Sequence, residues 1–156
     1  MTLLDRLAGG RSLRARASRE VAAAPPRVFR AIGEVTAAEL PAAGLPAPAA
    51  ALLRRLCSER GGKDEPLVAQ VLCEGFAVLG SDPLREVVLG RRPRGRLVAG
   101  VLCEPAGRGS LVRAEVRARP GAALPLLAPL WLGAGRRVAE RLLEAWLEAV
   151  RRRAEA

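Results

Sequence analysis

A β-hairpin is predicted by the stretch Phe76-Ala-Val-Leu-Gly-Ser-Asp-Pro-Leu-Arg-Glu-Val-Val-Leu-Gly90. Two runs rich in Val and Leu flank Ser81-Asp82-Pro83, and these residue types initiate turns because they preset or tolerate the backbone angles that turns need. We therefore expect antiparallel strands over 74–79 and 84–91. The hairpin defines two neighbouring strands of a sheet, but it does not identify a reaction.

One strand and two helices are predicted before the hairpin. Residues 12–21 alternate between small apolar and polar side chains, which is the period of a half-buried strand. Pro25 and Pro26 suit the first turn of a helix, and apolar residues then recur at helical spacing. A proline-rich bend leads to a second short helix over 49–57. The segment 66–72 fits either a short helix or a strand.

More strands and a long helix are predicted after the hairpin. Segments 96–104 and 110–119 are typical of strands and are separated by a Gly-rich turn. Together with the hairpin they form one antiparallel meander. From Trp131 to the end, apolar residues recur at helical spacing and make a continuous stripe, as in a long amphipathic helix.

The composition limits the chemistry that the chain can perform. Its 156 residues fit a single domain over 1–156, with 1–11 expected as a flexible N-terminus. Half of the residues are hydrophobic but only 3% are aromatic, so the core and any pocket should be aliphatic. With no His and no Tyr, the chain lacks the usual proton shuttle and the commonest zinc ligand. Its three cysteines form no C-x-x-C pair, so we expect no metal, no cofactor and a reducing cytoplasm.

The formal net charge of +10 raises the question of a polyanionic partner. However, the arginines are spread along the whole chain and lack the interleaved aromatic residues of a nucleic-acid stacking surface. We therefore do not expect nucleic acid as the partner. The apolar segment 122–134 contains Pro125 and Pro129 and is shorter than the roughly 20 residues that cross a bilayer, so we expect no transmembrane segment.

Several stretches carry a family resemblance. These are 21–29, where a strand leads into a helix, 35–41, 76–90, 114–117 and 148–155. In this order, and with the longest helix last, they resemble the helix-grip fold of a bacterial branch of the START, polyketide-cyclase and pollen-allergen-like (SRPBCC) superfamily. The resemblance implies an α+β fold in which a curved antiparallel β-sheet wraps around a long C-terminal α-helix, with two short helices after the first strand. The short link over 91–96 departs from the family pattern.

The resemblance also implies a hydrophobic cavity between the sheet and the terminal helix. Across the superfamily such cavities bind lipids, sterols or polyketides, and some members cyclise them. Ala15, Ala17, Ala114 and Val116 are small side chains on strand faces that should meet the helix. The space next to them is either a cavity or filled by a closely packed helix, and both alternatives stay open because protein interiors are normally dense.

Glu86 is the candidate catalytic residue. It shares a predicted strand face with Leu84 and Val88, so its carboxylate can point inward and act as a general acid or base. An ion pair with a nearby arginine, or a strand that faces the other way, are the alternatives. Glu115 lies between Arg113 and Arg117 and is expected in a surface ion-pair ladder.

The candidate ligand-binding residues are those expected around the cavity. Aromatic side chains would form its walls, Glu39 lies at its mouth or holds a loop, and a buried cysteine acts as a small hydrophobe. The set comprises Phe29, Glu39, Phe76, Val88, Cys103 and Trp131.

Three functions follow from these observations. The leading hypothesis is binding of a small hydrophobic ligand, lipid or polyketide-like, between the sheet and the C-terminal helix. The second is a cofactor-independent cyclase or aromatase in which Glu86 transfers protons. The third is an interaction module whose arginine-rich faces contact an anionic partner. The sequence favours a binding protein over an enzyme and identifies neither the ligand nor the oligomeric state.

Overall fold

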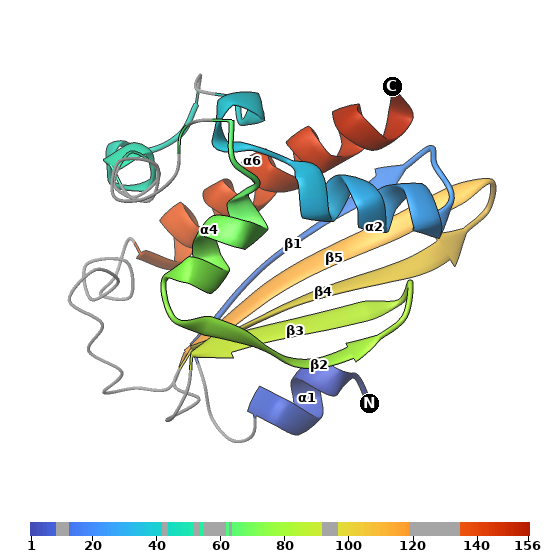
Figure 1. Ribbon diagram of the computed structural model, residues 1–156, viewed down its shortest axis with the longest axis horizontal. Helices are drawn as coiled ribbons and strands as arrows, with labels where there is room; N and C mark the ends of the chain where they lie inside the picture. Colours follow the sequence, from blue (N-terminus) through green and yellow to red (C-terminus); the bar gives the residue numbers. More distant parts are fainter. Residues whose placement is uncertain are drawn as a thin grey trace.

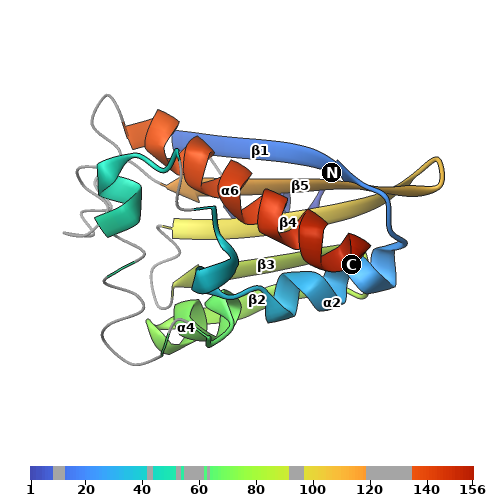
Figure 2. The ribbon, with the colours of Figure 1, turned by 90° about the horizontal axis from the view of Figure 1, so that it is seen from above.

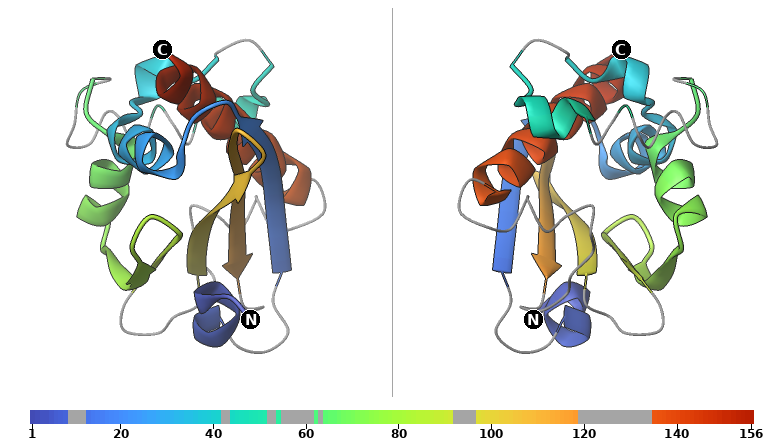
Figure 3. Two further views of the ribbon diagram at one scale, coloured as in Figure 1. Left: turned by 90° about the vertical axis from the view of Figure 1, so that its right-hand side faces the viewer. Right: turned by 90° about the vertical axis from the view of Figure 1, so that its left-hand side faces the viewer.

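Five antiparallel strands form one sheet in the order β1-β5-β4-β3-β2 (Figure 1). The strands are β1 (Leu13–Val21), β2 (Phe76–Asp82), β3 (Glu86–Arg91), β4 (Leu97–Ala106) and β5 (Gly109–Ala118). The sheet is curved, and it partly wraps around a long C-terminal helix (Figure 3). This is the α+β fold that the sequence predicts, including the meander from β2 to β5.

The structure is a computed structural model that describes residues 1–8, 13–41, 44–51, 54, 62, 64–91, 97–118 and 135–156. Its helices are α1 (Leu3–Ala8), α2 (Pro25–Glu34), α4 (Leu67–Cys73) and α6 (Gly135–Glu155), with a single 3₁₀ turn, η1, at Ala37–Glu39. Residues 47–51 are also helical and overlap the second helix expected over 49–57. The ambiguous segment 66–72 forms helix α4.

The predicted hairpin is formed by β2 and β3. Asp82 pairs with Glu86 across it, and a bulge between Val78 and Gly80 shifts the register. The Arg85 N–H donates to the Asp82 carbonyl oxygen at 3.0 Å and closes the turn. The first strand of the hairpin therefore extends further along the chain than expected, and the turn lies later.

The two faces of the sheet differ because side chains alternate along each strand. On β5, Val112 and Ala114 pack in the main core with α6, whereas Arg113 and Arg117 lie on the other face. Helices α2, α4 and α6 cover the first face, which we call the inner face (Figure 2). Helix α1 lies against the outer face (Figure 3).

Helix α6 packs against the inner face through its apolar stripe. Leu147 and Val150 are buried beside Val112. The guanidinium of Arg19 on β1 donates to the carboxylate of Glu148, which joins the helix to the edge strand. The apolar stripe and this ion pair together fix the position of α6 along the sheet.

Helix α1 occupies a segment expected to be flexible. Leu4 and Ala8 are buried and form a small cluster with Val88 and Val98 of the outer face. Gly100 leaves the room for this helix, because a Cβ there would lie 2.9 Å from the Leu4 Cδ2 atom. The outer face is therefore partly a second core rather than a solvated surface.

Candidate functional site

An apolar cavity of about 470 Å³ lies between the inner face of the sheet and helices α2, α4 and α6. Each of these elements contributes side chains to its wall. Among them are Phe29 of α2, Val71 of α4, Val87 and Leu89 of β3, and Leu142 and Trp146 of α6. Of the small residues that left a cavity or close packing open, Ala114 and Val116 line this cavity, whereas Ala15 and Ala17 do not.

Local sequence patterns explain why these side chains meet. Val87 and Leu89 are two residues apart on β3, so both point to the inner face. Leu142 and Trp146 are four residues apart on α6 and lie on one side of the helix. Phe29 belongs to the apolar side of α2, whose first turn is started by two prolines.

Two of the carboxylates that border the cavity, those of Glu86 and Glu115, are engaged elsewhere. Glu86 borders the cavity, but its Oε2 accepts a hydrogen bond from the Leu3 N–H at 2.8 Å and its Oε1 accepts one from the Leu4 N–H at 2.9 Å. The carboxylate of Glu115, which also borders the cavity, accepts a hydrogen bond from Arg117 on the outer face. The interior of the cavity is thus lined almost wholly by apolar groups.

The cavity reaches the surface at the β2–β3 hairpin and α2. Val78 and Leu84 line it and are 49% and 51% exposed. Gly33 on α2 and Pro83 in the turn are exposed lining residues as well. We call this opening the mouth of the cavity.

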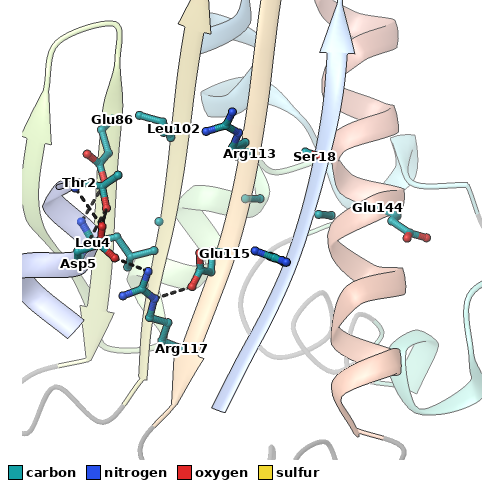
Figure 4. A pocket seen from close by; sticks show the side chains of 14 residues that line it. Thr2, Leu4, Asp5, Ser18, Glu86, Leu102, Arg113, Glu115, Arg117 and Glu144 are labelled. Atoms are coloured by element: carbon teal, nitrogen blue, oxygen red, sulfur yellow. Dashed lines mark hydrogen bonds and ion pairs between the residues drawn. The ribbon is translucent and has the colours of Figure 1, made fainter. Parts of the chain in front are cut away.

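A polar hollow of about 660 Å³ lies on the outer face beside α1 (Figure 4). Arg117, only 7% exposed, extends between Asp5 of α1 and Glu115 of β5. The hydrogen bond from Arg117, together with one from the Thr2 N–H, holds the pKa of Asp5 well below its ordinary value of 3.8. These ion pairs hold α1 on the sheet and engage the carboxylates of Asp5 and Glu115 there.

The structure places one predicted ligand-binding residue, Phe29, in the cavity wall. Val88 is fully buried on the outer face under α1, because the alternation along β3 sends Val87 and Leu89 inward and Val88 outward. Glu86 follows the same alternation, so its carboxylate meets α1 and not the cavity. The sequence pattern predicts that the side chains of Glu86 and Val88 point inward, but both point to the outer face.

Three other predicted residues lie away from the cavity wall. Glu39 closes a capping box with Thr36 and pairs with Arg153 at 2.8 Å. Burial opposes ionisation of Glu39, but these hydrogen bonds keep its pKa below the ordinary 4.5. Cys103 is buried in the main core, and burial raises the pKa of its thiol. Phe76 is half-buried at the start of β2, and Trp131 lies outside the described residues.

Two prominent wall residues, Leu142 and Trp146, belong to the stripe that the sequence identified only as the core-facing side of the terminal helix. A tryptophan within such a stripe is the one signal that could have marked the site, since large rings are rare in this chain. In the described ranges no group of three or more His, Cys, Asp or Glu side chains could hold a metal ion. No helix within those ranges is long and apolar enough to cross a bilayer.

No protein-family model matches the chain, and no curated protein matches it either. Among solved structures, it is similar to an AHSA1-like protein from Rhizobium etli, with 17% identity, a TM-score of 0.53, and alignment over 94% of this chain and 84% of that one. It is also similar to the KanY protein, with 14% identity, a TM-score of 0.50, and coverage of 94% and 100%. A Polyketide_cyc-like protein from Corynebacterium glutamicum aligns over 92% of both chains at 15% identity, with a TM-score of 0.47.

The sheet, the long C-terminal helix and the cavity between them define a helix-grip protein. The likeness to the AHSA1-like protein and to KanY confirms, at the level of the fold, the helix-grip resemblance stated from the sequence. At identities of 14–17%, the TM-scores of 0.50 and 0.53 show a shared fold and nothing about the ligand. The ligand must be argued from this chain's own residues.

Proposed function

We propose that this protein binds a small, uncharged hydrophobic ligand, lipid or polyketide-like, in the cavity between the sheet and α6. The observation that carries the proposal is the cavity itself. Its volume of about 470 Å³ lies within the range of about 300–1,000 Å³ typical of small-molecule sites. Its wall is apolar and includes two aromatic rings, Phe29 and Trp146. These rings supply large contact area at low entropic cost.

The engagement of Glu86 supports binding over catalysis. A general acid or base must reach the proton that it transfers, whereas this carboxylate is bonded to two backbone amides of α1. The proposal therefore includes no reaction and no cofactor. It places the protein in the cytoplasm, where free thiols such as those of Cys73 and Cys103 persist.

The test is a titration with the neutral fluorescent probe N-phenyl-1-naphthylamine, followed by displacement with fatty alcohols, sterols and aromatic polyketides. We expect saturable binding with energy transfer from Trp146 to the probe. Native mass spectrometry of the purified protein should show a retained small molecule in part of the sample. An absence of saturable binding by any of these compounds would contradict the proposal.

A cavity-filling variant makes the test specific. Ala99 lines the cavity on β4, and Ala99→Phe should fill part of it and weaken probe binding strongly. Leu102→Phe is the matched control, because Leu102 lies on the same strand but borders the outer hollow. Equal probe affinity in the two variants would place the binding site outside the cavity.

A further inference from the structure

The turn between β2 and β3 has an unusual residue at its third position. Leu84 has a φ of 60° and is the only non-glycine residue with a positive φ among those described. Because the ring of Pro83 fixes a negative φ at the second position, a positive φ at the third makes this a type II turn. That position normally holds Gly or Asn, since a larger side chain crowds the backbone. A leucine kept under this strain points to a use for its side chain.

The side chain of Leu84 is not used for packing in the core. It is 51% exposed and lines the cavity at the turn, and Val78, a lining residue further back on β2, is 49% exposed. The ring of Pro83 is exposed next to Leu84. We call Val78, Pro83 and Leu84 the apolar rim. Exposed apolar side chains at the opening of a cavity suit a contact surface.

Two exposed arginines lie near the mouth, one on the hairpin and one on α2. Arg85 follows Leu84, has a side chain that is 66% exposed, and makes only a loose 3.7 Å ion pair with Asp82. Across the mouth, Arg30 of α2 lies one turn before Gly33, a lining residue, and so stands close to the mouth without lining it. Arg30 is exposed and has no ion-pair partner among the residues that the structure describes.

We propose that the apolar rim, with Arg30 and Arg85, docks the cavity mouth onto an anionic lipid bilayer. The rim side chains would enter the boundary between headgroups and acyl chains, and the guanidinium groups would contact lipid phosphates. Three apolar side chains are too few for the core of a stable protein interface, whereas a bilayer needs only shallow insertion and diffuse charge. If the proposed function also holds, the ligand passes between membrane and cavity without crossing water.

The experiment is sedimentation of the full chain with phosphatidylcholine vesicles, with and without phosphatidylglycerol. We expect binding to the anionic vesicles only, and weaker binding as salt rises. Leu84→Gly should reduce the partition coefficient about tenfold, because an inserted leucine side chain is lost, while thermal stability is kept or increased by relief of strain. Arg30→Gln should reduce it roughly fivefold, the contribution of one arginine near an anionic surface.

Matched controls come from α1, which lies against the outer face of the sheet. Leu7 is 40% exposed, and Arg6 is exposed without an ion-pair partner in the described part of the chain. Leu7→Ala and Arg6→Gln should therefore leave vesicle binding unchanged. Equal losses in these controls would show that binding is not localised at the mouth and would overturn the proposal.

Other results would also overturn it. One is that the wild-type protein does not sediment with anionic vesicles. Another is that Leu84→Gly and Arg30→Gln both sediment as much as the wild type does. A third is that the chain self-associates and that Leu84→Gly abolishes this self-association. The last would make the rim an interface between two copies. Probe binding without vesicles separates this proposal from the proposed function, since Arg30→Gln should keep full affinity for N-phenyl-1-naphthylamine. Vesicle binding through Leu84 without any probe binding would support docking and reject the ligand cavity.

Discussion

Replacing Glu86 by Gln should destabilise the protein from the outer face of the sheet. The carboxylate is 5% exposed and accepts hydrogen bonds from the backbone N–H groups of Leu3 and Leu4, at 2.8 and 2.9 Å. Glutamine keeps the size of the side chain but replaces one acceptor oxygen by an NH₂ group. One of the two amides of α1 then faces a donor, and the hydrogen bond to the other loses its charge.

The expected loss is about 2 kcal/mol in the free energy of unfolding. A hydrogen bond to a charged group contributes about 1.5–3 kcal/mol, and a neutral one about 1 kcal/mol. Loss of a negative charge at the start of a helix adds about 0.3–1 kcal/mol. The loss caused by Glu86→Gln cannot exceed the free energy that holds α1 on the sheet. This six-residue helix can detach while the rest of the protein stays folded. Burial of the Leu4 side chain contributes about 1.5–3 kcal/mol to that free energy before ordering costs, and burial of Ala8 and the ion pair between Arg117 and Asp5 add to it.

Urea denaturation followed by tryptophan fluorescence measures the global loss, and hydrogen exchange measures the opening of α1 directly. A change of about 2 kcal/mol should accelerate exchange of the Leu4 amide roughly thirtyfold. Glu144→Gln is the control, because Glu144 is half-exposed in a 3.2 Å surface pair with Arg141 and should cost below about 0.5 kcal/mol. The reasoning is refuted if Glu86→Gln matches this control and the Leu4 amide keeps its wild-type exchange rate.

Three further predictions follow from the same structure. The pKa of Asp5 is lowered from 3.8 in the folded state. Its ionised carboxylate therefore adds its full share to the free energy of unfolding above pH 3.8, and this share is lost as the pH falls through the folded pKa. Asp5→Asn should flatten this part of a curve of stability against acid pH. Gly109→Ala should cost more than about 2 kcal/mol, since a Cβ there would lie 2.2 Å from a carbonyl oxygen of β1. Gly107→Ala should cost only about 1 kcal/mol, because the added Cβ would meet no atom within 4 Å and only the φ of 56° is unfavourable for alanine. Urea denaturation of the two variants measures both losses. With a thiol reagent, the exposed Cys73 should react in the native state and the buried Cys103 only on unfolding, as peptide mass spectrometry would show.

The parts of the fold that were predicted are those with a strong local signal. The turn residues around Pro83 identified the hairpin, and the long apolar stripe that includes Leu142 and Trp146 identified the terminal helix. Helix α1 was missed for a physical reason. Its six residues have little helical stability of their own, and the helix depends on Glu86, which lies more than eighty residues away in the sequence. No local pattern contains such a contact.

The direction of β3 could not be predicted from its alternation. Val87 and Leu89 are apolar on one face, and Val88 beside Glu86 offers an equally plausible buried face on the other. A strand covered on both sides has no polar face to mark the solvent side. The sheet is covered on both sides here, by α4 and α6 on the inner face and by α1 on the outer face. The cavity wall was therefore assigned to the wrong side of this one strand.

The orientation of β3 also decides how the cavity would select the ligand proposed for it. Because the carboxylate of Glu86 is bound by α1, polar groups that could recognise a ligand are confined to the mouth, at Ser81 and Asp82. The described lining residues include no Arg or Lys, so a ligand carboxylate at the inner end would be buried without a partner, which is costly. Selection would then rest on the size and shape of the ligand, and each methylene group that fits would add about 1–3 kcal/mol to the binding free energy. For neutral ligands of increasing size, the affinity should rise until the cavity of about 470 Å³ is filled and should fall for larger ligands.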